Sequence, residues 1–198
     1  MSGDREIEVD LPMWYNGHLM KTSFECQKSL DGLSTLGTSH GYQHIWKEGS
    51  SILADDQFQF NWFGNQRFYT LTGVSKEGDE IIMGRAGAND PNFNLRSDPV
   101  FIHRKKAKQN YSYFNILESH GAYSTVTEIP SKPYSDIEEI KILHEDEQYF
   151  IGSFVAQGNK YEVYCSLKDN NPQSSHRVTS GDSEFSWTGV YKLVTSKN

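Results

Sequence analysis

The sequence lacks the long apolar runs, paired cysteines and basic excess that mark several classes of protein. No apolar stretch approaches the ~18 residues that a membrane-spanning helix needs, so we expect no membrane insertion. The two cysteines, Cys26 and Cys165, allow one disulfide, but two free thiols are favoured. Lys and Arg number 19 against 26 Asp and Glu, a net charge of −7, which argues against nucleic acid as a partner because phosphate recognition needs a basic face.

Motifs for several kinds of chemistry are also missing. The chain has no Gly-x-Ser-x-Gly nucleophile elbow and no Gly-rich phosphate loop. Seven histidines are present, but only His40 and His44 are close in sequence, and the residues around them are typical of a loop entering a strand. A metal site needs two or three converging ligands, so we expect no metal and no cofactor in this chain. The first six residues hold no apolar run, so we also expect no signal peptide within it.

What the sequence does contain is alternation with a period of two residues. Phe58, Phe60 and Trp62 alternate with polar residues, which predicts a strand with one buried face, and a Gly-Asn turn leads into a second strand at 67–72. No stretch keeps a helical period over ten residues. Further strands are predicted at 5–11, 41–47, 80–85, 99–104, 111–117, 137–144, 148–155, 160–167 and 183–194. The pattern predicts an all-β, antiparallel β-sandwich with little or no helix, as one domain over residues 1–198.

Two polar stretches are candidates for function. Residues 87–96 form an Asn-rich loop between two predicted strands, which is either a solvated connection or a binding loop. Glu118 and His120 are two positions apart, so in a strand they face the same side, where they suit a polyhydroxylated or acidic sugar. On spacing alone, a strand end with polar tips is the favoured alternative. The basic run 103–110 is interpreted as a solvated hairpin tip rather than a seat for an anion.

Several motifs in a fixed order resemble a known family. They are Asp10-Leu-Pro-Met-Trp-Tyr-Asn-Gly-His-Leu-Met20, Leu36-Gly37, Gly41-Tyr-Gln-His-Ile-Trp-Lys-Glu-Gly49, Gly87-Ala-Asn-Asp-Pro-Asn-Phe-Asn-Leu-Arg96 and Leu117-Glu-Ser-His-Gly121. Together they are similar to the C-terminal β-sheet region of the alginate (oligoalginate) lyases of polysaccharide lyase family 17, in the heparinase II/III-like group. The resemblance covers nearly the whole chain.

The resemblance implies that the catalytic residues and the β-sandwich lie in different parts of a larger enzyme. Enzymes of this family join an α/α-toroid domain to a β-sandwich domain and cleave uronic acid oligosaccharides by β-elimination, often exolytically. Their catalytic Asn-His pair, two tyrosines and structural zinc lie upstream of the stretch matched here. We therefore expect this chain to be the C-terminal part of a larger periplasmic or secreted lyase, with no lyase activity alone. Its expected partners are an acidic oligosaccharide such as alginate and the toroid domain.

Four residues are carried over as candidate substrate contacts. Glu118 is first, because it matches the Glu of the family's Leu-Glu-Pro-His-Gly, although Ser119 stands in place of the Pro. His120 is second, and Arg96 and Asn89 of the central loop are third; an Arg suits bidentate pairing with a uronate carboxylate. We expect residues 87–96 and 118–121 to lie at the same end of the sandwich. A stand-alone carbohydrate-binding module for acidic polysaccharide is the alternative function, and a pure scaffold for the toroid is a third.

Overall fold

The computed structural model describes residues 7–29, 34–87, 97–107 and 111–197, which build four antiparallel sheets. Sheet A is made of β1 (Ile7–Trp14), β9 (Ser97–Ala107), β8 (Glu80–Gly87), β5 (Ile45–Ile52) and β3 (Gln27–Lys28), with β4 (Ser34–Thr35) also on β5. Sheet B is made of β11 (Ile129–Ser131), β10 (Asn115–Ser124), β7 (Arg67–Ser75), β6 (Asp56–Gly64) and β2 (His18–Thr22). Sheet C is made of β12 (Ile137–Glu145), β13 (Tyr149–Ala156), β14 (Asn159–Ser166) and β17 (Tyr191–Lys197), and sheet D is the hairpin of β15 (Ser175–Ser180) and β16 (Ser183–Thr188).

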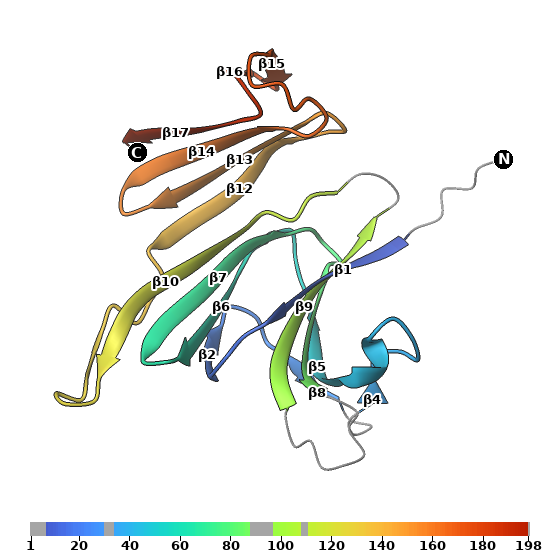
Figure 1. Cartoon of the computed structure of the whole chain (residues 1–198), viewed down its shortest axis with the longest axis vertical. Helices are drawn as coiled ribbons and strands as arrows, with labels where there is room; N and C mark the ends of the chain where they lie inside the picture. Colours follow the sequence, from blue (N-terminus) through green and yellow to red (C-terminus); the bar gives the residue numbers. More distant parts are fainter. Residues whose placement is uncertain (1–6, 30–33, 88–96, 108–110, 198) are drawn as a thin grey trace.

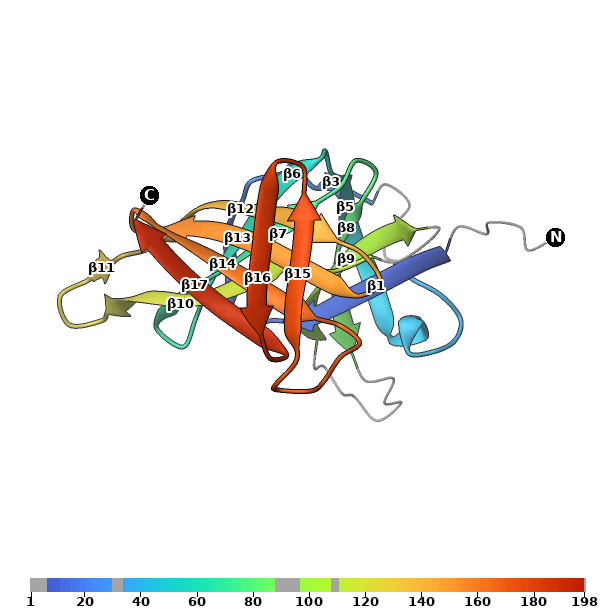
Figure 2. The ribbon, with the colours of Figure 1, turned by 90° about the horizontal axis from the view of Figure 1, so that it is seen from above.

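The sheets follow one another as layers, from sheet A through B and C to the hairpin D (Figure 1). Seen from above, β15 and β16 lie across the strands of sheet C (Figure 2). The helical content of the described residues is one 3-10 turn, Tyr42–His44. The predicted all-β sandwich is therefore confirmed. No helix among the described residues is long and apolar enough to cross a membrane.

The main core lies between sheets A and B. Phe58, Phe60 and Trp62 of β6 are at most 5% exposed and pack towards Ile81 and Phe101 of sheet A, which confirms the predicted buried face. Burying side chains of this size contributes roughly 1.5–3 kcal/mol each. A second core joins sheet C to the hairpin D, and a third covers the outer face of sheet A.

Three predictions about elements are corrected. The strand expected at 111–117 begins at Asn115 and runs to Ser124. Tyr113, before it, reaches sheet A, where its hydroxyl lies within hydrogen-bond distance of the carbonyl oxygens of Val9 and His103. The strand expected at 183–194 is two strands, divided at Gly189, whose φ of 92° suits a turn. Residues 27–41, predicted to be a loop, contain β3 and β4.

The basic run at 103–110 is also not a solvated tip along its described part. Lys105 lies within β9 and is 3% exposed. Its Nζ donates to the carbonyl of Ser112 at 3.0 Å and lies 3.7 Å from a carboxylate oxygen of Asp79. A buried ammonium needs such partners, and the distant Asp79 could not be found from the local pattern. Both cysteines are free thiols, as favoured from the sequence.

Candidate functional site

Glu118 and His120 lie on the same face of β10, as their spacing predicts. The Glu118 carboxylate accepts a short hydrogen bond from the Ser135 hydroxyl and a second, 3.2 Å long, from the backbone N–H of Asp136. Both donors belong to the segment that connects sheets B and C. Glu118 therefore holds this connection against β10 in the described structure.

His120 holds the same connection one step further along. Its Nδ1 lies 2.8 Å from the carbonyl oxygen of Lys132, so Nδ1 carries the proton and donates, because a carbonyl only accepts. Its Nε2 lies 2.8 Å from the Thr70 hydroxyl, which donates to it when the ring is neutral and accepts from Asn61 Nδ2 at 2.8 Å. The result is a continuous chain of hydrogen bonds from β6 to the connection.

The polar face of β6 extends this arrangement. Gln59 Nε2 donates to the carbonyl of Ile137 at 3.2 Å, and Asn61 Nδ2 donates to that of Pro133 at 3.3 Å. Gln57 bonds to both the carbonyl of Glu138 and the N–H of Ile140. We call these contacts the inter-sheet network; its side chains are Gln57, Gln59, Asn61, Thr70, Glu118 and His120. Thr70 links Asn61 to His120, and the other five bind the backbone of residues 132–140.

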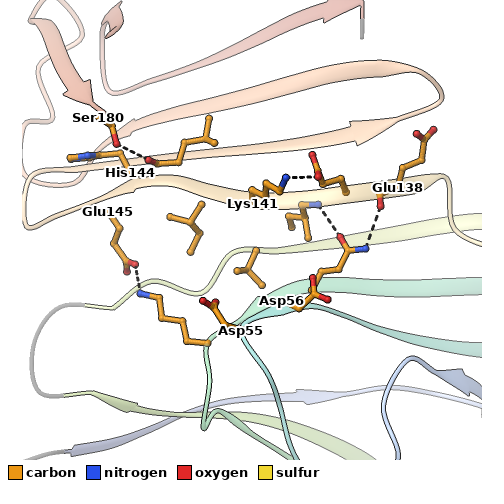
Figure 3. Close-up of a pocket in the computed structure, with 14 residues that line it drawn as sticks. Asp55, Asp56, Glu138, Lys141, His144, Glu145 and Ser180 are labelled. Atoms are coloured by element: carbon orange, nitrogen blue, oxygen red, sulfur yellow. Dashed lines mark hydrogen bonds and ion pairs between the residues drawn. The ribbon is translucent and has the colours of Figure 1, made fainter. Parts of the chain in front are cut away.

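A cleft of about 700 Å³ opens on one side of the network, between β6 and β7 of sheet B and β12 of sheet C. Glu145 and Glu138 lie towards opposite ends of it (Figure 3). The Glu145 carboxylate lies 3.0 Å from the Lys76 ammonium, and the carbonyl of Glu138 accepts from Gln57, so both contacts bridge the cleft from sheet C to sheet B. Acidic residues dominate its lining: Asp55, Asp56, Glu138, Glu139 and Glu145, against Lys76 and Lys141. We call it the acidic cleft. Its excess of carboxylates does not suit an acidic oligosaccharide.

A second cleft, of about 630 Å³, opens beside β2 and the same connection. It is lined by Met20, Lys21, Thr22, Ser23, Gln59, Asn61, Phe68, Thr70, Pro133, Tyr134 and Ser135. We call it the Tyr134 cleft. Thr70 and Ser135, which line it, are hydrogen-bonded to His120 and Glu118, so the two predicted residues lie directly behind its wall.

Two of the predicted residues lie in a part of the chain that the structure does not describe. Asn89 and Arg96 fall outside the described residues, and so does most of the central loop, so the expected meeting of residues 87–96 with 118–121 stays a prediction. Within the part of the chain that the structure describes, no three His, Cys, Asp or Glu side chains gather as metal ligands.

A buried group of charges between sheets A and B was not predicted from the sequence. His103, fully buried on β9, donates from Nε2 to Asp79 Oδ2 at 3.0 Å, and Lys105 Nζ lies 3.7 Å from the same oxygen. Burial lowers the pKa of His103 and of Lys105. Burial alone would raise the pKa of Asp79, but the hydrogen bonds from His103 and the Lys76 N–H, with the charge of Lys105, outweigh it and lower that pKa.

A second missed group ties β1 to β9. Asp10 accepts two hydrogen bonds from the Arg104 guanidinium, at 2.8 and 2.9 Å, and a third from the Tyr42 hydroxyl at 2.5 Å. Burial together with Asp10 raises the pKa of Tyr42 to about 12. Both groups join residues far apart in sequence, so no local spacing pointed to them, and their hydrogen bonds and ion pairs hold strands together.

Comparison with known proteins gives two relatives, while no family model matches the chain. It is 28% identical over 200 residues to the exo-oligoalginate lyase of Saccharophagus degradans, a match that covers 100% of this chain and 27% of that protein. It is 31% identical over 197 residues to an alginate lyase of Stenotrophomonas maltophilia, covering 98% of this chain and 26% of that protein. The chain thus spans about a quarter of the length of the curated relatives it matches.

Proposed function

Because this chain is related along its whole length to a region of alginate lyases and folds as an all-β sandwich, we propose that it is the β-sandwich region of a lyase acting on acidic oligosaccharides. In this role it supports the catalytic toroid and forms one side of the substrate cleft. The full-length match to two lyases is the observation that carries the proposal.

A supporting rather than a catalytic role follows from the chemistry of β-elimination. The reaction needs a base at the C5 proton of the uronate and a group that neutralises its carboxylate. The titratable side chains that cluster in the described residues are engaged otherwise: His103, Asp79 and Lys105 are buried between sheets, and Glu118 and His120 hold the connection to sheet C. We therefore place the reacting groups, and the zinc of the family, on the partner region.

The finer parts of the proposal rest on the relatives. One of them is named an exo-oligoalginate lyase, so we propose cleavage from a chain end that releases one unsaturated uronate at a time. From the family that the sequence motifs resemble, we also propose a periplasmic or secreted location. The alternative, a stand-alone carbohydrate-binding module, is favoured by the Tyr134 cleft.

A truncation of the Stenotrophomonas relative tests the supporting role. The region that matches this chain is removed, and turnover of alginate oligosaccharides is followed by the ultraviolet absorbance of the unsaturated product. We expect the truncated enzyme to lose most of its turnover. A truncated enzyme with unchanged kcat and KM would contradict the proposal.

The chain by itself is the second arm of the experiment. Incubated with oligosaccharides of alginate, heparin or hyaluronan, it should give no rise in absorbance. Turnover that a point substitution in this chain abolishes would show that the region carries reacting groups and would overturn the proposal.

A further inference from the structure

We propose that the Tyr134 cleft is a binding site for a uronate residue of an acidic oligosaccharide, a site separate from the residues predicted from the sequence. The substrate class rests on the proposed function, whereas the site itself is argued from the cleft. Its volume, about 630 Å³, lies within the few hundred to ~1,000 Å³ usual for ligand pockets. Its lining combines an exposed aromatic ring, a lysine, carboxamides and hydroxyls.

Tyr134 supplies a flat apolar surface on a fixed backbone. Tyr134 is 73% exposed, so its ring is accessible to a ligand in the cleft. The residues on either side are held: the carbonyl of Pro133 accepts from Asn61, and the hydroxyl of Ser135 donates to Glu118. Because the backbone on both sides is held, only the two side-chain torsions of Tyr134 remain to be fixed when the C–H face of a pyranose packs on the ring.

Lys21 supplies the charge, and a β-bulge explains its direction. Leu19 pairs with Trp62 and Lys21 with Asn61, although Trp62 and Asn61 face opposite sides of sheet B. Residues two apart on a regular strand would face the same side, so the extra residue Met20 turns Lys21 onto the polar face. Among the described residues no carboxylate pairs with Lys21, so its ammonium remains available to a uronate carboxylate.

The floor of the cleft is already ordered without a ligand. The amide nitrogens of Gln59 and Asn61 are engaged with Thr72, Thr70 and the backbone of the connection, which leaves their amide oxygens as acceptors for sugar hydroxyls. Ser23 accepts a hydrogen bond from the Gln59 N–H at 2.8 Å, so its own hydroxyl hydrogen is left to donate. Because these groups need little rearrangement, the ordering cost of binding is small.

The acidic cleft provides an internal contrast. The two clefts lie on the same polar face of sheet B, one beside Gln57 and the other beside Asn61. The acidic cleft would repel a uronate, while the Tyr134 cleft has Lys21 and, among its described lining residues, no Asp or Glu. This difference assigns the anionic sugar to the Tyr134 cleft.

Calorimetric titration of the 198-residue chain with oligomannuronate and oligoguluronate tests the assignment. Neutral cello-oligosaccharides of equal length and oligoglutamate serve as comparators for the sugar and for the charge. We expect Tyr134→Ala and Lys21→Ala each to weaken binding by about tenfold or more. Lys21→Arg keeps the positive charge and should retain most of the wild-type affinity. The matched controls are Tyr191→Ala, which removes a ring that is also 73% exposed, and Lys192→Ala beside it.

The control variants should bind as the wild type does, and melting curves of all variants should coincide because the side chains are exposed. No binding of uronate oligosaccharides by the wild type, equal binding of oligoglutamate, or equal losses in the control variants would each overturn the assignment. Binding that ignores Tyr134 and Lys21 would place the sugar elsewhere on the chain. The proposed function is tested separately by the truncation of the Stenotrophomonas relative, so a failure of that proposal can be told apart from a failure of this one.

Discussion

Gln57 on β6 bonds to Ile140 on β12 through its side chain: the amide oxygen accepts the Ile140 N–H at 3.0 Å, while the amide nitrogen donates to the carbonyl of Glu138 at 3.3 Å. A side chain of sheet B thus occupies the hydrogen-bonding positions of a strand beside sheet C. The face of β6 opposite the core is therefore a docking surface for the next layer, not a face left to water.

Replacing Gln57 by Ala should lower the free energy of unfolding by about 1–3 kcal/mol, because two hydrogen bonds to the backbone of β12 are lost. Urea denaturation measures the change. The control is Gln173→Ala, an exposed Gln outside the network, which should be neutral. Equal effects of the two substitutions would show that the bond does not hold sheet C.

Glu118→Ala distinguishes the two roles open to this residue. Its carboxylate binds Ser135 and the Asp136 N–H, so we expect the free energy of unfolding to fall by about 1–3 kcal/mol. The neighbouring Ser119→Ala, at an exposed position, should leave it unchanged. An unchanged melting temperature with weakened oligosaccharide affinity would instead identify Glu118 as the sugar contact suggested by the family motif.

Asp79→Asn should be the most destabilising of these changes. It removes the negative charge that compensates Lys105, which is 3% exposed, and leaves only a neutral amide oxygen to accept the His103 hydrogen bond. Leaving a buried charge without its partner typically costs about 3–5 kcal/mol. Asp55→Asn, at the exposed rim of the acidic cleft, is the control and should be near neutral. A small effect of Asp79→Asn in thermal denaturation would mean that Lys105 finds another partner.

The free energy of unfolding should depend on pH in part through His103. Burial lowers its pKa, so below the ordinary His value of ~6.5 the unfolded chain binds a proton that the folded chain excludes. The contribution of His103 to the free energy of unfolding is therefore fully present above that pH, and it is lost as the pH falls towards the lowered pKa of the folded state. The charged groups facing it are Asp79, whose pKa is lowered from 3.8 and so lies below this window, and Lys105, whose pKa burial lowers.

Chemical denaturation between pH 7 and pH 5 checks this dependence. We expect the free energy of unfolding of the wild type to fall across the window, and His103→Gln to fall less steeply, while exposed His18→Gln keeps the wild-type slope. Identical slopes for all three proteins would assign the pH dependence to other groups.

Local patterns predicted much of the sandwich, because a strand with one buried face repeats every two residues. Phe58, Phe60 and Trp62 were recognised on that basis and form the core between sheets A and B. The same pattern could not tell that Gln57, Gln59 and Asn61 bind the connection to sheet C, since their partners lie more than 70 residues away. Alternation distinguishes the core face of a strand but leaves the covering of its polar face undetermined.

The site was predicted only in part, for the same reason. The shared face of Glu118 and His120 followed from their spacing, but the segment that they hold did not. The direction of Lys21 depends on the bulge at Met20, and a one-residue shift of register leaves no mark in composition. The exposure of Tyr134 depends on how sheet C docks, which the spacing of residues near 134 does not encode.

The central proposal is that the chain binds the acidic sugar without cleaving it, and one measurement tests both parts. A defined oligomannuronate is titrated into the chain, and the recovered sugar is then analysed by mass spectrometry. We predict saturable binding that Tyr134→Ala weakens about tenfold, and recovery of the oligosaccharide at its original length. β-Elimination adds no water, so cleavage would give a saturated and an unsaturated fragment whose masses add up to that of the parent. Such fragments, formed by the wild-type chain and absent after a point substitution in it, would contradict the account.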